Sequence, residues 1–324
     1  MCHPGKAGSN SVGLLMPERK LLHILRGYCC PVCAPNQYRG MAVSMRGPRA
    51  ENQDNYLLVQ PGGQAEWLVN EQLESRRITG WGNQWWRLLV ADGMGGHRNG
   101  REVSEALVQL ALEIRPVWEV SVLRQTLNHL HQQLLARFGQ QHDQHSPGAT
   151  LVWVDVHVSG LVMLAHVGDS RLYQWREGRQ AWRQVTHDHT WQEFAWRVDA
   201  EAGSPLPQEK GLAQAMGYGS YGVLANTDGA RFPAFSPQLH LELAEEMLPH
   251  ARAHADVTRL SLPPGDALLL STDGLWATPG RDVPSLPSLN ELDSSASLDT
   301  LAEDALAAGG RDNTTVVLLR PYAS

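Results

Sequence analysis

The chain has 324 residues, of which 42% are hydrophobic and 19% are charged. This length and apolar content are enough to bury one large core or two modest ones, and they exclude a wholly disordered chain. The formal net charge of −7 argues against a nucleic-acid-binding protein, which needs a basic face, and it suits a site that collects cations.

The first 40 residues differ in composition from the rest of the chain. All four cysteines lie at or before Cys33, so no disulfide framework can hold the main body together, and we expect a cytoplasmic location. No apolar run is long enough for a membrane-spanning helix. Residues 1–40 show no sustained period, so we expect a disordered extension followed by one domain over residues 41–324. The alternative is a zinc-binding extension built on Cys29, Cys30 and Cys33.

The hydrophobic pattern predicts short strands, two helices and then further strands. Apolar residues recur at helical spacing over 103–114 and 123–134, and they alternate over 150–158. Further strands are expected at 41–44, 55–59, 87–91, 161–167, 170–175, 181–185, 267–272 and 314–320, with a short helix at 301–308.

Two segments lack a clear pattern. Residues 203–229 are rich in glycine and are expected to form a flap, and residues 284–297 are expected to form a loop. Elsewhere the strands come in adjacent groups with the long helices between them. This order predicts an α+β fold in which antiparallel sheets are covered by helices.

Aspartates recur where hydrophobic strands end or in tight turns beside them. Asp92, Asp169, Asp273 and Asp312 share this setting, and Asp54 stands directly before a predicted strand. Any one Asp-Gly pair is equally typical of a turn. Several carboxylates gathered without a cation would repel one another, and carboxylate oxygens are the ligands that Mg²⁺ and Mn²⁺ prefer.

The order of the motifs resembles that of the metal-dependent protein phosphatases of type 2C. The matching segments are 49–54 (RAENQD), 91–97 (ADGMGGH), 148–150 (GAT), 167–171 (VGDSR), 271–274 (STDG) and 312–315 (DNTT). The resemblance covers about residues 41–320. It implies a central β-sandwich of two antiparallel sheets flanked by α-helices, in four layers, with metal ions in a cleft at one edge.

The resemblance also implies an activity. Members of bacterial type hydrolyse phosphoserine and phosphothreonine monoesters by direct attack of a hydroxide that bridges two Mn²⁺ or Mg²⁺ ions, and a third ion can be present. The implied partners are a phosphoprotein substrate and a bacterial Ser/Thr kinase, with no nucleic acid. A monomeric enzyme is expected.

Each aspartate takes a role from the resemblance. Asp92 is similar to the carboxylate that bridges both metal ions, and Gly93 to the residue that lends a carbonyl oxygen to one of them. Asp273 and Asp312 resemble ligands of the second ion. Asp54 resembles the carboxylate that binds metal-coordinated water.

Two further roles complete the implied site. Arg49 resembles the phosphate-binding arginine, whose planar fork suits phosphate oxygens, and with Asp92 it forms the expected catalytic pair. Asp169 together with Asp273 resembles the third-metal site of bacterial members.

Two positions depart from the family pattern. Gln53 stands where many relatives have glutamate, which weakens one water-mediated metal contact. Met94 stands where many eukaryotic members have a histidine proposed as the general acid. His97 follows three residues later and need not replace it, so the identity of the general acid stays open.

Alternatives of function are a catalytically weak, phosphoprotein-binding pseudo-phosphatase and a phosphatase for one partner-switching regulator. Inactive family members usually lack metal carboxylates, whereas the core set is complete here. Phosphatases of partner-switching regulators usually carry large sensor domains, for which residues 1–40 are too short.

Two further motifs were weighed against plainer interpretations. His187 and His189 could bind zinc, but paired surface histidines after a strand usually do not. Residues 217–222 fit G-x-G-x-x-G, but without a strand before them or a helix after them a flap is favoured.

Overall fold

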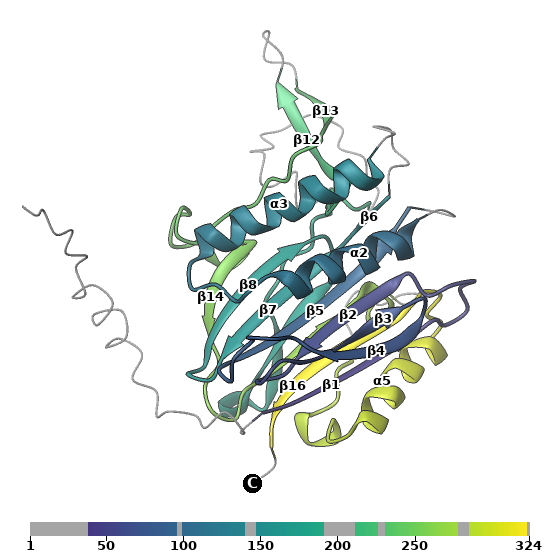
Figure 1. Ribbon diagram of the computed structural model, residues 1–324, viewed down its shortest axis with the longest axis vertical. Helices are drawn as coiled ribbons and strands as arrows, with labels where there is room; N and C mark the ends of the chain where they lie inside the picture. Colours follow the sequence, from purple (N-terminus) through teal and green to yellow (C-terminus); the bar gives the residue numbers. More distant parts are fainter. Residues whose placement is uncertain are drawn as a thin grey trace, which may run out of the picture.

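The computed structural model describes residues 38–95, 99–139, 147–190, 211–225, 231–277 and 285–322. Two antiparallel sheets pack against each other in this part of the chain, and helices lie on both outer sides (Figure 1). A small third sheet projects beyond helix α3. The α+β prediction and the four-layer arrangement are confirmed.

The larger sheet has eight strands and the smaller sheet has five. In spatial order the larger contains β14 (Val257–Ser261), β8 (Leu161–Val167), β7 (Leu151–His157), β5 (Trp85–Met94), β2 (Asp54–Val59), β3 (Gln64–Val69) and β4 (Gln72–Arg77), with β6 (Gly148–Ala149) paired to β5. The smaller contains β1 (Tyr38–Met45), β16 (Thr314–Pro321), β15 (Ala267–Ser271), β9 (Arg171–Arg176) and β10 (Ala181–Gln184). The third sheet contains β11 (Gln214–Ala215), β12 (Gly219–Ala225) and β13 (Arg231–Ser236).

Three α-helices cover the sandwich in the described part of the chain. Helices α2 (Gly100–Glu113) and α3 (Val120–Phe138) lie on the larger sheet, and α5 (Ser295–Ala307) packs against β1 and β16 of the smaller sheet. Single 3-10 turns are η1 (Glu177–Arg179), η2 (Arg252–His254), η3 (Asp273–Leu275) and η4 (Leu289–Glu291). Helix α5 begins at a capping box formed by Ser294 and Ser297, which satisfies backbone donors of its first turn.

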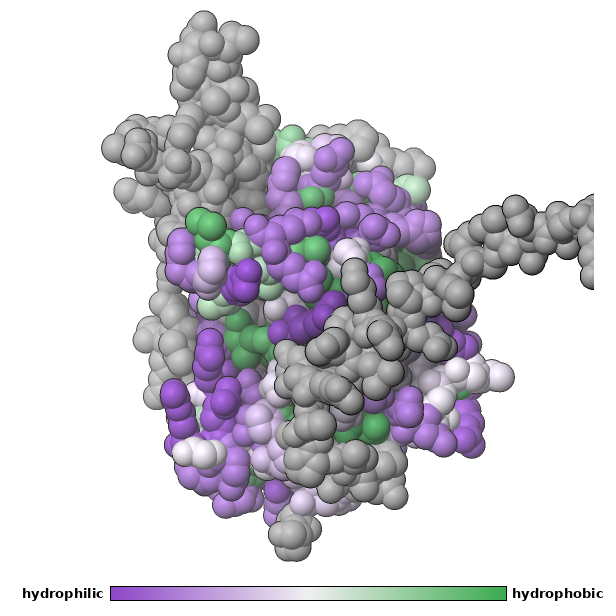
Figure 2. Space-filling model, turned by 90° about the vertical axis from the view of Figure 1, so that its left-hand side faces the viewer, coloured by the Kyte–Doolittle hydropathy of each residue, from purple (hydrophilic) through white to green (hydrophobic). Residues whose placement is uncertain are grey.

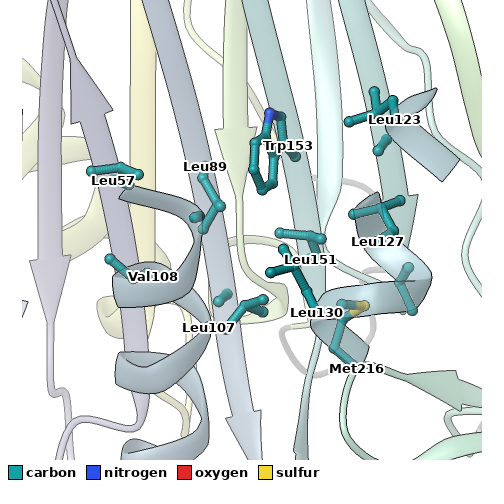
Figure 3. Packing of buried hydrophobic residues seen from close by; sticks show 14 of the residues in the cluster. Leu57, Leu89, Leu107, Val108, Leu123, Leu127, Leu130, Leu151, Trp153 and Met216 are labelled. Atoms are coloured by element: carbon teal, nitrogen blue, oxygen red, sulfur yellow. The ribbon is translucent and has the colours of Figure 1, made fainter. Parts of the chain in front are cut away.

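The side chains of the central strands alternate between two hydrophobic layers. Leu89 of β5 packs with Leu107 of α2 in the layer under the helices, where Leu127 of α3 also lies (Figure 3). Leu88 and Val90 of the same strand point the other way, into the layer between the sheets. Because β5 is covered on both faces, its sequence is a continuous apolar run.

The tryptophans in and beside the larger sheet serve packing. Trp81, Trp85 and Trp86 are buried. Trp153 is fully buried, and the guanidinium of Arg87 stacks on its ring with 4.1 Å between the Arg87 Cζ and the ring centroid. Figure 2 shows one face of the molecule, where hydrophilic residues predominate among the described ones.

Several elements were not predicted. Strand β4 has the sequence QLESRR and is exposed along its length, so no apolar alternation marks it. Strands β3 and β14 were also missed. The flap prediction for 203–229 is wrong over 214–215 and 219–225, where β11 and β12 form. The loop predicted at 284–297 is too long, because α5 starts at Ser295.

The first described strand begins three residues before the expected start of the domain at Met41. Strand β1 begins at Tyr38, which pairs with Pro321 and is buried between the sheets. The rest of the expected extension, with the zinc alternative at its cysteines, lies outside the described residues. Within the residues that the structure describes, no helix is long and apolar enough to cross a membrane.

Candidate metal centre

The larger sheet brings two of the predicted carboxylates together. Strand β2 begins at Asp54, and its antiparallel register with β5 sets Asp54 opposite Asp92. Asp54 is buried, and its Oδ2 accepts a hydrogen bond of 2.7 Å from the hydroxyl of Thr272. Because Thr272 follows β15, this bond joins the two sheets at the edge where the carboxylates lie.

The smaller sheet contributes two more carboxylates at the same edge. Asp273 opens η3, two residues after β15 ends at Ser271, and Asp312 stands two residues before β16 begins. Strands β15 and β16 are antiparallel neighbours, so the end of one and the start of the other meet.

Asp169 lies where the chain passes from one sheet to the other. It is in the turn between β8 of the larger sheet and β9 of the smaller sheet. Asp169 lines the same cavity as Asp92, Asp273 and Asp312, and its carboxyl interacts with the charge of Asp273.

This cavity has a volume of about 280 Å³. Six of the seven residues predicted for the site line it: Arg49, Asp92, Gly93, Asp169, Asp273 and Asp312. The seventh, Asp54, lies behind Asp92. Gln53, Met94, Gly95, Thr150, Leu212 and Asn313 complete the lining.

The glycines that follow two of the aspartates are required by close backbone approach. A Cβ on Gly93 would lie 2.2 Å from the carbonyl oxygen of Gly100 and 2.6 Å from that of Gln53. A Cβ on Gly274 would lie 1.9 Å from the carbonyl oxygen of Asn313. The Asp-Gly pairs are therefore part of how the site is packed, beyond any preference for a turn.

Burial and mutual repulsion raise the pKa values of four of the carboxyls. Burial, followed by the charges of Asp54, Asp273, Asp169 and Asp312, raises the pKa of Asp92 well above its usual range. Burial raises the pKa of Asp54 to about 7, and burial together with the charge of Asp273 raises the pKa of Asp169 to about 7. Burial and the charge of Asp312 raise the pKa of Asp273 to about 6.

These residues fit a divalent cation. The Oδ1 atoms of Asp54 and Asp273 are buried and have no hydrogen-bond partner among the described residues. A buried carboxylate oxygen without a partner is costly, and a hard cation would both satisfy it and offset the repulsion. The donors are oxygens throughout, which suits Mg²⁺ or Mn²⁺ better than Zn²⁺.

Arg49 is placed to meet an anion in the cavity. Its side chain is half exposed, its Nε donates to the carbonyl oxygen of Arg311, and its Nη2 donates to Asp312. Of the two departures from the family pattern, Met94 lines the cavity, and Gln53 donates a 2.7 Å hydrogen bond to Glu51. His97 lies outside the described residues.

The structure adds residues that the sequence analysis did not single out. Asn313 accepts a hydrogen bond from the backbone of Gln53 and donates to the carbonyl oxygens of Arg46 and Glu51, so it holds the segment that carries Arg49. Its place directly after Asp312, inside a matching motif, was the available signal.

The description of His189 as a surface histidine is wrong. His189 is fully buried and hydrogen-bonds to Asp256, whereas His187 is partly exposed and stacks on His254. His187 and His189 are therefore not two ligands of one site.

Comparisons with known proteins agree with this geometry. The sequence profile described as Protein phosphatase 2C matches residues 75–313, which include Asp92, Asp169, Asp273 and Asp312. "Protein phosphatase PhpP" of Streptococcus pneumoniae serotype 2 (strain D39) is 26% identical over 242 residues, covering 72% of this chain and 84% of the relative. "Serine/threonine phosphatase stp" of Listeria monocytogenes serovar 1/2a is 26% identical over 248 residues, covering 72% and 83%.

Solved structures show the same fold. The catalytic domain of the serine/threonine protein phosphatase PstP, solved in complex with two manganese ions, is similar with a TM-score of 0.53 and 22% sequence identity. The similarity covers 89% of this chain and 99% of that one. Because the family profile matches more than half of the chain and the carboxylates meet at one edge of a matching sandwich, the chain belongs to the protein phosphatase 2C family.

Proposed function

We propose that this protein is a metal-dependent Ser/Thr phosphoprotein phosphatase of bacterial type. The observation that carries the proposal is the meeting of four carboxylates around one cavity, with the fifth, Asp54, opposite Asp92 and with Arg49 at the side of the cavity. Relatives named protein phosphatase and serine/threonine phosphatase support the reaction class. The alternative of a pseudo-phosphatase gains no support from the site, because every carboxylate of the expected set is present.

We assign the ion ligands as the sequence predicted them. Asp92, with the carbonyl oxygen of Gly93, would serve both core ions, Asp273 and Asp312 would complete the second, and Asp54 would orient coordinated water. Mn²⁺ or Mg²⁺ would occupy these positions, and Asp169 with Asp273 would hold a third ion. Such ions, when bound, supply a water of lowered pKa and positive charge opposite the phosphate oxygens.

The protein's own groups bind and orient the phosphate. The guanidinium of Arg49 presents two parallel N–H donors, which fit two phosphate oxygens and hold the phosphorus in one orientation. The buried floor is fixed because the hydroxyl of Thr272 donates to Asp54 of the other sheet and accepts from the N–H of Thr315, so the carboxylates need little rearrangement as charge develops. Direct hydrolysis needs no nucleophilic side chain.

The substrate and setting follow from this assignment. A cavity that opens to solvent beside an exposed arginine can admit the phosphate of a protein side chain. We therefore infer a phosphoprotein substrate and an opposing Ser/Thr kinase, and we keep the monomeric state and the cytoplasmic location as the expectations from the sequence.

The test is hydrolysis of a phosphothreonine peptide by the purified chain, measured as the release of inorganic phosphate. Activity should require Mn²⁺ or Mg²⁺, disappear with EDTA and return when the ion is restored. Full activity after exhaustive chelation would overturn the proposal, and so would metal-saturated protein that binds the phosphopeptide without hydrolysing it.

A further inference from the structure

The turn that carries Asp169 is held through its backbone. Gly168, directly before Asp169, has a φ of +104°, and a Cβ there would lie 2.7 Å from Cγ2 of Thr150. Ser170, directly after it, shares a 2.6 Å hydrogen bond with the hydroxyl of Thr150. Thr150 in turn accepts from the backbone N–H of Asp92 and donates its own N–H to the Asp92 carbonyl oxygen. The turn is thereby tied to the strand of another proposed ligand.

His189 hydrogen-bonds to both backbone groups of Gly168, the N–H and the carbonyl oxygen. The N–H of Gly168 donates to Nδ1 of His189 at 3.1 Å, and the backbone N–H of His189 donates to the carbonyl oxygen of Gly168 at 2.8 Å. The histidine is fully buried, so neither bond competes with water. Both peptide groups before Asp169 are therefore fixed by one residue.

The hydrogen bonds define the protonation of the imidazole ring. Nδ1 of His189 also lies 3.0 Å from Nε2 of Gln214, whose Oε1 accepts from the backbone of His240. With two N–H donors directed at it, Nδ1 carries no hydrogen. The hydrogen is then on Nε2, which donates to Oδ1 of Asp256 at 2.8 Å.

Asp256 anchors both flanks of the turn. Its Oδ2 accepts from the backbone N–H of Glu242 at 2.9 Å, and its carbonyl oxygen accepts from the N–H of His166. The ring of His166 reaches the carbonyl oxygen of Ser170 at 3.0 Å. Asp256 is thus connected to the turn through two histidines. Its carboxylate binds His189, which binds Gly168, and its backbone carbonyl oxygen binds His166, which binds Ser170.

His166, His189 and Asp256 could also be interpreted as a metal site, because their potential ligand atoms lie within 4.8 Å of one another. Both ring nitrogens of His189 already have hydrogen-bond partners of matching polarity, and Nε2 of His166 has the Ser170 carbonyl. A metal ion would have to displace the His189–Asp256 bond. The geometry favours a hydrogen-bonded support over a second metal centre.

We propose that His189, oriented by Asp256, is a positioning residue that holds the Asp169 turn so that the carboxylate faces Asp273 across the cavity. The inference rests on the proposed function, since it takes Asp169 as an ion ligand. His189 touches neither the ion nor the substrate in this arrangement. Its loss should weaken the ion bound by Asp169 and Asp273 and leave the other ions in place.

Two substitutions separate the two ends of the ring. His189→Asn keeps an amide oxygen at the position of Nδ1 and can still accept from Gly168. His189→Gln places its amide near Nε2, keeps a partner for Asp256 and loses the bond to Gly168. A merely structural requirement for a buried polar group would treat the two variants alike.

His131 offers a matched control. It is also buried, its Nδ1 accepts from the backbone N–H of Gly217 at 2.9 Å, and its Nε2 lies 2.9 Å from the carbonyl oxygen of Pro237. His131→Gln therefore removes the same kind of histidine–glycine bond at a place that holds no predicted ion ligand.

The experiment is a titration of the metal-free full chain with Mn²⁺, following free ion by electron paramagnetic resonance, with melting temperature measured on the same samples. For His189→Gln we expect the weakest class of bound Mn²⁺ to lose about 10-fold in affinity or to disappear, as for other residues that orient ligands. His189→Asn should retain it, and His131→Gln should melt lower while binding Mn²⁺ like the wild type.

Several outcomes would overturn the inference. Unchanged Mn²⁺ binding by His189→Gln would do so, as would equal weakening in His131→Gln. One equivalent of zinc on the wild type that His189→Gln loses would instead establish a metal site at the His189–Asp256 cluster. If His189→Gln does not fold, the milder Asp256→Asn should weaken the same ion class, and unchanged binding there would count against the proposal.

The proposed function is tested separately in these samples. A wild-type chain that binds Mn²⁺ without hydrolysing phosphopeptide would overturn the proposed function alone, because the titrations still decide the role of His189. A wild-type chain that binds no Mn²⁺ would overturn both.

Discussion

Arg49 and Asp312 form an ion pair across the mouth of the cavity, from Nη2 of the guanidinium to Oδ2 of the carboxylate. The residue assigned to phosphate and a residue assigned to a metal ion thus neutralise each other. Because both are partly exposed, the pair can exchange partners at little cost. Ion binding at Asp312 would release Arg49 toward an incoming phosphate.

Replacing Arg49 should therefore act on phosphate binding. Arg49→Ala removes the hydrogen bonds of the guanidinium to the phosphate. One hydrogen bond to a charged group is worth about 1.5–3 kcal/mol, so kcat/KM for a phosphothreonine peptide should fall by at least about 10- to 100-fold. Arg49→Lys should recover part of the loss, since it keeps the charge without the fork. Steady-state kinetics test this, with Arg76→Ala as the control, because Arg76 forms an exposed ion pair with Glu113 elsewhere.

The carboxylates should differ in their effects on activity. Asp92→Asn, Asp273→Asn and Asp312→Asn should each abolish most of the Mn²⁺-dependent turnover, whereas Asp169→Ala should cost less at saturating Mn²⁺. Asp299→Asn, on the exposed side of α5, is the control. Near wild-type turnover in Asp273→Asn would show that the ligand assignment is wrong.

The metal-free protein should lose stability as pH rises. Burial raises the pKa of Asp54 and of Asp169 to about 7 and that of Asp273 to about 6, so the folded state keeps protons that the unfolded state releases. Since the folded state binds more protons between about pH 4 and pH 7, the free energy of unfolding decreases across this window. Melting curves of chelated protein should show the decline.

Adding Mn²⁺ should reverse that dependence. Protons and the ion compete for the same oxygens, so Mn²⁺ should bind more tightly as pH rises and should restore the melting temperature most at the alkaline end. Asp273→Asn removes one buried charge, so without metal it should melt above the wild type, and with Mn²⁺ below it. A metal-free protein that melts higher at alkaline pH would contradict the repulsion argument.

A buried ion pair should matter for stability away from the site. Arg87 donates to both carboxylate oxygens of Asp155 and to the carbonyl oxygens of Ala111 and Ile114 at the end of α2. Asp155→Ala leaves the guanidinium buried and unpaired, which should lower the free energy of unfolding by about 3–5 kcal/mol. Urea unfolding measures this; Glu113→Ala, which breaks an exposed pair, should cost about 1 kcal/mol or less.

The start of the domain can be tested by truncation. A chain beginning at Tyr38 should fold like the full chain, whereas a chain beginning at Met41 lacks Tyr38 and the first pairs of β1 with β16. Because Tyr38 is buried between the sheets, the shorter chain should melt several degrees lower. Equal melting temperatures would support the boundary expected from the sequence.

The sequence predicted best what depends on local pattern. The apolar run of Leu88, Leu89 and Val90 predicts a strand, because a short run of this kind is typical of a strand buried on both faces. The helices were predicted because their apolar residues recur along one face. The aspartates were placed by their motifs. Strand β4 was not predicted because its exposed residues show no alternation of apolar and polar side chains. It is an edge strand that pairs with β3.

The hydrogen bonds that hold the Asp169 turn could not be predicted from the sequence, for a different reason. His189 meets Gly168 and Asp256, which are 21 and 67 residues away, and nothing local distinguishes a buried histidine from an exposed one. Gly168 follows β8 and Asp256 precedes β14, which are neighbours in the larger sheet, and only the folded chain brings His189 to both. Long-range hydrogen bonds of this kind have no signature in spacing.

Asp54 and Asp92 belong to one sheet, and Asp273 and Asp312 adjoin strands of the other. A cation bound among them would act as a brace across the sandwich, resisting any slide of one layer over its neighbour. The apolar contacts of Tyr56 and Leu270 between the sheets would then be shielded from transient opening. Amide hydrogen exchange deep in the sandwich would report on events at its rim, so catalytic readiness and global rigidity would rise and fall together.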